Sequence, residues 1–226
     1  MSALFVAGAG TDVGKTHVAC ALIRTLRAGG APVAAIKPLV SGIDEADWAA
    51  SDPGRLLAAL GRPLTAETLA AISPWRYRAP LAPDMAAAPE GREVEVEAVI
   101  GFCRDQIVAD AHRRLLIEGV GGVMSPIATL ATNLDWMCAL GCPVLLVGGS
   151  YLGSISHTLT AIAALRGAGL SLAGVVISQS ADAQTPFDET VASVARLSGA
   201  AVVAAGRDAE DASWTSTALG MIGWTS

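Results

Sequence analysis

One stretch near the N-terminus, Gly8 to Thr16 (GAGTDVGKT), constrains the fold more than any other part of the sequence. An apolar run, Ala3 to Ala7, precedes it and a helical pattern of apolar residues follows it. A phosphate-binding loop occurs between a strand and a helix, because the turn directs backbone N–H groups at one point and the helix N-terminus adds partial positive charge. The sequence therefore predicts a nucleotide-phosphate site, in which Lys15 reaches the terminal phosphates and the Thr16 hydroxyl holds Mg²⁺.

This loop is longer than the standard pattern. The standard spacing would put the first glycine at position 9, but Ala9 stands there and the glycine is Gly8. A glycine-rich turn that only caps a helix is the alternative interpretation, but such a turn does not need a following Lys-Thr. We therefore expect a variant phosphate loop.

Composition limits the classes of function. The chain has 226 residues, a net charge of -6 and a pI of about 5.0, which argues against broad nucleic-acid or membrane-surface binding. Mean hydropathy is +0.49, yet no apolar run approaches the ~20 residues of a membrane span. Because no basic segment precedes the first strand, we expect a soluble, cytoplasmic protein. Its cysteines are expected to be buried thiols in a reducing compartment, namely Cys20, Cys103, Cys138 and Cys142.

Strand-like and helical segments alternate along the whole chain. Strands are expected at 3–7, 33–36, 115–118, 143–147, 172–177 and 200–204, and helices at 15–28, 51–60, 65–72, 93–111, 134–140, 154–167, 186–197 and 208–219. Residues 39–50 and 73–92 are expected to be loop. The alternation predicts an α/β fold with a doubly wound, mostly parallel sheet, similar to P-loop NTPases, in a single domain spanning residues 1–226. Ligands of such sheets gather at the carboxyl ends of the strands.

Charged residues follow two further predicted strands. Lys37 ends the second strand, where an ammonium beside bound phosphates can neutralise charge during phosphoryl transfer if that strand neighbours the first. Glu118 enters a Gly-Val-Gly-Gly turn, a position at which an acid completes a Mg²⁺ shell. Asp52 is an N-cap candidate, and spacing alone favours that role over a metal ligand. Ser41, four residues after Lys37, is a loop serine that could bind a polar substrate.

The histidines are scattered. His17, His112 and His157 have no carboxylate or cysteine at a ligand-like spacing. Nucleophilic triads and metal-hydrolase chemistry therefore receive no support.

In their order along the chain, these motifs resemble the dethiobiotin synthetase family, the ATP-dependent ligases of biotin synthesis. The matching pieces are Gly8 to Thr16, Lys37-Pro38-x-x-Ser41-Gly42, Ser51-Asp52, Ile117 to Gly122 and Leu152-Gly153-x-Ile155-x-His157. They cover the first two thirds of the chain, and the last third matches only in its pattern of strands and helices.

The resemblance implies that 7,8-diaminopelargonic acid forms a carbamate with CO₂, that ATP phosphorylates the carbamate, and that the second amine closes the ureido ring. It implies catalytic roles for Lys37, Lys15 and Thr11, with Lys37 touching both carbamate and γ-phosphate. It implies ATP contacts from Asp12, Val13, Gly14, Lys15, Thr16, His17, Asp52, Glu118, Gly119, Val120 and Gly121, Mg²⁺ ligation by Thr16, Asp52 and Glu118, and substrate contacts from Thr11, Lys37, Ser41, Gly122 and Ser156. A homodimer is also implied, with the substrate tail crossing the interface near residues 150–157.

Three places depart from the family's pattern. Ser178-Gln179 stands where many members carry asparagine to read adenine, and Ala-Ala-Gly-Arg-Asp at 204–208 replaces a proline-bearing turn against the base. Ser156 replaces an asparagine near the substrate tail. We therefore expect intact catalytic residues and a relaxed nucleotide preference.

Other classes of function stay open from the sequence. Another ATP-dependent ligase of the same architecture, such as a cobyrinate amidotransferase-type synthetase, usually carries a glutamine-hydrolysing domain, for which 226 residues leave no room. A dimeric ATPase switch of the ParA/MinD type carries a lysine after the first glycine of the loop, where this chain has Ala9, and often ends in a basic or membrane-binding helix, whereas residues 214–226 contain no lysine or arginine. A nucleotide-binding module without turnover is a third alternative, against which Lys37 and Glu118 argue.

Overall fold

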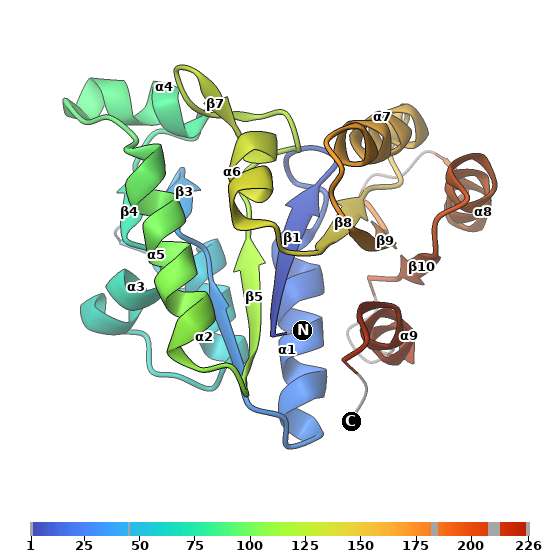
Figure 1. Cartoon of the computed structure of the whole chain (residues 1–226), viewed down its shortest axis with the longest axis horizontal. Helices are drawn as coiled ribbons and strands as arrows, with labels where there is room; N and C mark the ends of the chain where they lie inside the picture. Colours follow the sequence, from blue (N-terminus) through green and yellow to red (C-terminus); the bar gives the residue numbers. More distant parts are fainter. Residues whose placement is uncertain (1, 45, 182–184, 208–212, 225–226) are drawn as a thin grey trace.

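The computed structural model describes residues 2–44, 46–181, 185–207 and 213–224. Its centre is a six-stranded sheet with the strand order β10-β9-β8-β1-β5-β2, in which every pairing is parallel (Figure 1). The strands are β1 (Ala3–Gly8), β2 (Val33–Ile36), β5 (Arg114–Glu118), β8 (Val144–Gly148), β9 (Leu172–Ser178) and β10 (Val202–Ala205). The chain starts in the middle of the sheet and winds outwards to both edges, which confirms the doubly wound α/β fold.

Helices cover both faces of this sheet. In Figure 1, α5 and α6 lie in front of the sheet and α1 lies behind it, where it packs against α2 and α9. The longer helices are α1 (Lys15–Ala28), α2 (Asp52–Ala59), α3 (Ala66–Ile72), α5 (Val96–Ala109), α6 (Asn133–Leu140), α7 (Ser154–Gly167), α8 (Phe187–Ser198) and α9 (Ser213–Ile222). No helix within the described ranges combines the length and the apolar character needed to cross a membrane.

The central strands are continuous apolar runs because both of their faces are covered. Every residue of β1 and of β8 is buried, as expected for parallel strands between two helical layers. On the α6 side, the ring of Phe5 meets that of Trp136 edge to face at 5.1 Å, and both side chains are fully buried. Such burial of large rings supplies much of the hydrophobic stabilisation of the core.

Two segments that we expected to be loop contain regular structure, so that prediction was wrong. β3 (Leu39–Ser41) pairs in parallel with β4 (Trp75–Tyr77), and a short helix, α4 (Pro83–Ala87), continues into a 3₁₀ turn, η1 (Ala88–Glu90). A small hairpin of β6 (Pro126–Ala128) and β7 (Ala131–Thr132) was also not predicted. Strands of two or three residues are too short to show a period, and only their partners make them visible.

The other element boundaries agree with expectation to within a few residues. The largest differences among the described bounds are three residues: α5 begins at Val96 rather than at residue 93, and α9 ends at Ile222 rather than at residue 219. The closing helix α9 begins at Ser213, and residues 208–212 of the segment predicted as helix lie outside the described residues. Of the four cysteines, three are buried as expected, but Cys138 is exposed.

Strand order changes how Lys37 reaches the phosphate loop. The sequence analysis placed Lys37 beside the loop on the condition that β2 neighbours β1, but β5 lies between these two strands. Glu118 ends β5 and therefore stands between the loop after β1 and Lys37 after β2. Glu118 contacts both Lys37 and Thr16, and so connects the end of β2 to the first turn of α1.

Candidate active site

The phosphate loop connects β1 to α1 in a tight backbone arrangement. Gly14 has a φ of 93° and Asp12 has a φ of 56°, the single positive φ of a non-glycine residue in the described chain. A side chain at Gly8 would place its Cβ 2.7 Å from the carbonyl oxygen of Gly10 and 2.9 Å from that of Gly121. This close backbone contact explains why the glycine of the long loop stands at position 8 and not at position 9.

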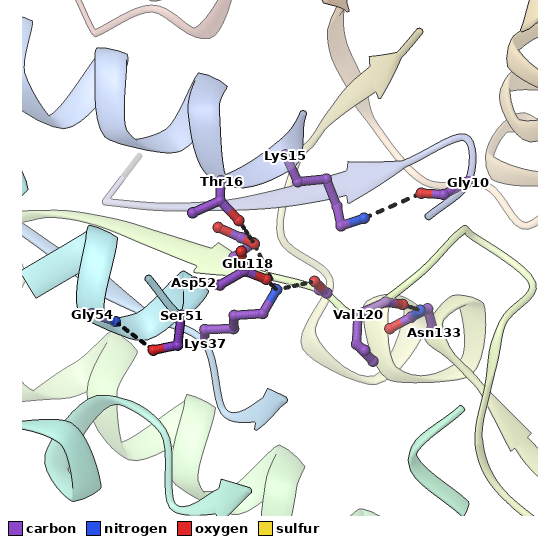
Figure 2. A network of polar contacts seen from close by, with 11 residues as sticks. Gly10, Lys15, Thr16, Lys37, Ser51, Asp52, Gly54, Glu118, Val120 and Asn133 are labelled. Atoms are coloured by element: carbon purple, nitrogen blue, oxygen red, sulfur yellow. Dashed lines mark hydrogen bonds and ion pairs between the residues drawn. The ribbon is translucent and has the colours of Figure 1, made fainter. Parts of the chain in front are cut away.

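A buried network of charges lies below the loop (Figure 2). The Glu118 Oε1 atom accepts hydrogen bonds from the Thr16 hydroxyl and from Lys37 Nζ, both at 2.6 Å. Lys37 Nζ also donates to the carbonyl oxygen of Gly119 at 3.2 Å and lies 3.1 Å from Asp52 Oδ2. The side chains of Lys37 and Glu118 are only 3% and 1% exposed, so each charge depends on its partner.

The pKa values of the two lysines of the site shift in opposite directions. Burial alone would lower the pKa of Lys37, but Glu118 and Asp52 together raise it above the ordinary lysine value. Burial and the nearby Lys37 ammonium lower the pKa of Lys15 from 10.5 to about 8, and its Nζ donates to the Gly10 carbonyl at 3.1 Å. Lys37 therefore keeps its proton near neutral pH, whereas no carboxylate of the described residues forms an ion pair with the Lys15 ammonium, which can accept an anion.

Asp52 does not cap its helix, contrary to the sequence-based expectation. Ser51 is the N-cap of α2, and its hydroxyl accepts a hydrogen bond from the backbone N–H of Gly54 at 3.2 Å (Figure 2). Asp52 is the first helical residue. Burial would raise the pKa of Asp52, but the Lys37 ammonium and the Thr16 hydroxyl lower it below its ordinary range. Because serine supplies the cap, the carboxylate is available for the site.

The donor set fits a hard divalent cation. Thr16, Asp52 and Glu118 bring a hydroxyl and two carboxylates together, and the buried Glu118 Oε2 has no hydrogen-bond partner. Within the residues that the structure describes, no group of three or more His, Cys, Asp or Glu side chains could hold a metal by itself. Mg²⁺ suits such an incomplete protein site, since it completes its shell with phosphate oxygens and water.

A turn after β5 faces the phosphate loop and holds the remaining predicted contacts. A Cβ on Gly122 would lie 3.3 Å from Gly10 Cα, and one on Gly121 would lie 3.7 Å from the Thr11 hydroxyl. The turn is fixed by Asn133, a buried residue of α6 that the sequence analysis missed. Its Nδ2 donates to the carbonyl oxygen of Val120 (Figure 2). It also donates to the carbonyl oxygen of Gly122.

A cavity of about 550 Å³ opens beside the loop, between α1, α2 and the ends of β9 and β10. Residues predicted to contact ATP line it, namely Asp12, Val13, Gly14, Thr16 and His17. Three arginines that the sequence analysis did not single out line it as well, Arg24, Arg55 and Arg207. Burial, followed by the charges of these arginines, lowers the pKa of His17. The helical spacing of Thr16, Cys20 and Arg24 is the sequence signal that could have placed Arg24 here.

Two predicted substrate residues lie outside this network. Ser41 is half-buried at the end of β3. Ser156 is exposed in the first turn of α7, and no hydrogen bond of the described residues joins its side chain to Lys15, Lys37 or Glu118.

The sheet order, the Gly-Lys-Thr loop and the acid at the end of β5 together define a P-loop nucleotide-binding protein of the doubly wound α/β class. The model of a family described as an AAA domain matches residues 2–211. The solved MinC:MinD cell division complex of Aquifex aeolicus has a similar fold, with a TM-score of 0.57, 12% identity and coverage of 96% of this chain and 86% of that chain. At this identity, the likeness concerns the fold alone.

Two relatives named ATP-dependent dethiobiotin synthetase are far more similar in sequence. The protein of Methylobacterium nodulans is 51% identical, over 92% of this chain and 94% of its own length. That of Caulobacter vibrioides is 55% identical, over 84% of this chain and 85% of its own length. The chain belongs to the ATP-dependent dethiobiotin synthetase family, and its resemblance to that family is confirmed.

The lowered pKa of Lys15 predicts a pH-dependent cost in stability. The unfolded chain binds the Lys15 proton up to about pH 10.5 and the folded chain only up to about pH 8, so the free energy of unfolding rises with pH between these values. We expect Lys15→Met to be more stable than the unsubstituted protein near pH 7 without nucleotide, by roughly 3 kcal/mol. Urea unfolding near pH 7 and near pH 10 measures the difference, which should shrink at the higher pH. An equal gain at both pH values would contradict this assignment.

Proposed function

We propose that this chain uses ATP to close the ureido ring of dethiobiotin from 7,8-diaminopelargonic acid and CO₂, through a phosphorylated carbamate. The observation that carries the proposal is the position of Lys37, buried below the phosphate loop and joined to Glu118 at 2.6 Å and to Asp52 at 3.1 Å. Relatives that are 51% and 55% identical carry the name of this activity. A dimeric ATPase switch is disfavoured because the likeness to MinD is limited to the fold.

The chain's own residues account for the chemistry required. Phosphoryl transfer to a carbamate depends on positioning and charge stabilisation more than on a protein nucleophile. Loop N–H groups from Asp12 to His17 and the Lys15 ammonium would bind the phosphates of ATP. Lys37, kept protonated by its carboxylate neighbours, would contact the carbamate and the transferred phosphoryl group. Mg²⁺ held by Thr16, Asp52 and Glu118 would neutralise phosphate charge when bound.

The diamine would lie across the carboxyl edge of the sheet. Thr11, Ser41 and Gly122 come from the loop after β1, the end of β3 and the turn after β5. Ser156 stands in the first turn of α7, a helix N-terminus whose buried Ser154 hydroxyl has no partner. A helix N-terminus attracts carboxylates, so this end of α7 suits the carboxylate tail of the substrate.

Release of phosphate tests the proposed reaction directly. We expect Mg-ATP and bicarbonate to yield phosphate only when 7,8-diaminopelargonic acid is present, together with dethiobiotin. Lys37→Ala should reduce this rate by about 10²-fold or more, because it removes a charge that stabilises the transition state and leaves Glu118 unpaired. Arg62→Ala, an exposed change outside the site, should leave it unchanged. Phosphate release without the diamine would instead favour an ATPase switch.

The metal role of Asp52 can be separated from the stability of α2. We expect Asp52→Asn to raise the Mg²⁺ concentration needed for half-maximal rate, since a neutral amide is a poorer ligand for a hard cation. Ser51→Ala is the matched control, because it removes the N-cap hydroxyl and should cost about 1 kcal/mol of stability with little change in Mg²⁺ requirement. An unaltered Mg²⁺ titration in Asp52→Asn would exclude Asp52 as a ligand.

We also propose a relaxed nucleotide preference. Ser178 lies directly behind the loop, where a Cβ on Gly14 would be 2.5 Å from its hydroxyl, and Gln179 Oε1 accepts from the backbone N–H of Arg207 at 3.3 Å. An amide oxygen used in this way is less available to read the amino group of adenine, and Asp208 of this turn lies outside the described residues. We expect CTP and GTP at equal concentration to support rates within about tenfold of that with ATP, as ~1.4 kcal/mol of discrimination would allow. A much larger advantage of ATP would contradict this.

A homodimer is the proposed assembly. The helix α4 packs against β6, and exposed apolar side chains occur immediately before and on α4 and around the β6–β7 hairpin. They are Leu81, Met85, Met124 and Leu130, the last of which is 97% exposed. Exposed apolar side chains on neighbouring elements are typical of an interface. We expect sedimentation of the chain as a dimer and of Leu130→Asp as a monomer, whereas a monomeric unsubstituted protein would contradict the assembly.

We further propose that residues 1–226 form a single domain that works in the cytoplasm, without nucleic-acid or membrane partners. The net charge of -6 and the single buried core support this proposal.

A further inference from the structure

Tyr151 and His157 form a polar pair that none of the roles above uses. The Tyr151 hydroxyl lies 2.8 Å from His157 Nδ1. The pair is held by the start of α7, where Gly153 has a φ of 94° and its carbonyl oxygen accepts from the His157 N–H at 3.1 Å. His157 is exposed to solvent, so its second ring nitrogen is accessible to water.

The phenol oxygen of this pair lies beside the phosphate loop. Tyr151 follows the end of β8, which is the neighbour of β1 in the sheet. A Cβ on Gly149 would be 2.9 Å from atoms of the Tyr151 ring, and one on Gly10 would be 3.6 Å from its hydroxyl. Lys15 donates to the carbonyl oxygen of this same Gly10. The tyrosine side chain therefore crosses from β8 to the loop that would hold the phosphates.

The segment before α7 is anchored, so this placement is well defined. The Ser150 N–H donates to the Ser180 hydroxyl at 3.0 Å, and the Ser180 N–H donates to the Ser150 hydroxyl at 2.9 Å. Ser150 is fully buried. This reciprocal pair joins the end of β8 to the end of β9 immediately before Tyr151, which fixes the direction in which the phenol leaves the backbone.

Ring closure requires a proton acceptor that the charged network does not provide. The attacking amine forms a C–N bond to the carbonyl carbon of the carbamoyl phosphate, the C–O bond to phosphate breaks, and phosphate leaves with the electron pair. The new nitrogen centre must then lose a proton. Lys37 is held as a cation by Glu118 and Asp52, and the Glu118 oxygen without a hydrogen-bond partner, Oε2, belongs to the proposed Mg²⁺ site. His17 lies on the other side, in the cavity with the three arginines.

We propose that Tyr151 and His157 are the proton relay for this step. The Tyr151 oxygen takes the proton of the attacking amine as its own proton passes to His157 Nδ1, and the exposed imidazolium returns it to water. Tyr151 is the catalytic residue of the proposed pair, because its oxygen would contact the reacting amine. His157 is a positioning residue that acts through the phenol. This inference rests on the proposed function and adds a role to residues outside the phosphate and metal sites.

A single-turnover experiment separates this role from binding and phosphorylation. With Mg-ATP, bicarbonate and 7,8-diaminopelargonic acid, ADP and dethiobiotin are quantified over time, and hydroxylamine traps the acyl phosphate. We expect Tyr151→Phe to form ADP within about twofold of the unsubstituted rate but dethiobiotin about 10²-fold or more slowly, as is typical for loss of general base catalysis. The trapped intermediate should accumulate in this variant only.

Chemical rescue tests the histidine. His157→Ala should slow dethiobiotin formation, and added imidazole should restore it several-fold by replacing the lost proton acceptor. Imidazole should not affect His112→Ala, the matched change of an exposed histidine before β5. A merely structural role of His157 predicts no rescue.

The outcomes distinguish the relay from the proposed function. If the unsubstituted protein forms no dethiobiotin, the proposed function is wrong. If it does, but Tyr151→Phe slows ADP and dethiobiotin equally or slows neither, the relay is wrong. If the melting temperature of Tyr151→Phe is much lower than that of the unsubstituted protein, the imidazole experiment on His157→Ala decides. In that case, no rescue by imidazole overturns the relay.

Discussion

The buried ion pair between Lys37 and Glu118 is the interaction on which the rest of the site depends. Burying two ions costs desolvation energy, which is offset only by close contact between them and by further polar contacts. Here Thr16, Asp52 and the Gly119 carbonyl provide these further contacts. The pair joins the ends of β2 and β5 to the first turns of α1 and α2. Removal of either partner would leave a buried charge with fewer partners, so the positions of Thr16 and Asp52 are coupled to this contact.

The excess of positive charge around the phosphate loop lowers the stability of the fold and favours the binding of anions. Lys37 already has two carboxylates, whereas Lys15 has only a backbone carbonyl, and its pKa falls to about 8. Three arginines add positive charge along the neighbouring cavity. Nucleotide phosphates would relieve this excess of charge, and active sites commonly carry such destabilisation because function requires it.

The loop after β1 and the turn after β5 pack closely against each other through their backbones. Gly8 allows the loop after β1 to approach the turn after β5 more closely than a side chain would permit, since its Cβ would lie 2.9 Å from the carbonyl oxygen of Gly121. Asn133 then holds that turn from α6 through two carbonyl oxygens. The phosphate loop is thus supported by the turn after β5 and, through that turn, by α6. The Tyr151 side chain lies beside the loop at Gly10.

Local patterns in the sequence determined the alternation of strands and helices, the phosphate loop with Lys15 and Thr16, and the importance of Lys37 and Glu118. These features depend on hydrophobic period and on residues adjacent in the chain, which a sequence displays directly. Tertiary structure alone decided that β5 separates β1 from β2, that β3 pairs with β4, and that Ser51 rather than Asp52 caps α2. It also decided the contacts of Asn133 and the approach of Tyr151 to Gly10. Each of these depends on contacts between distant segments or on a choice between adjacent residues of similar propensity, and local preference does not encode either.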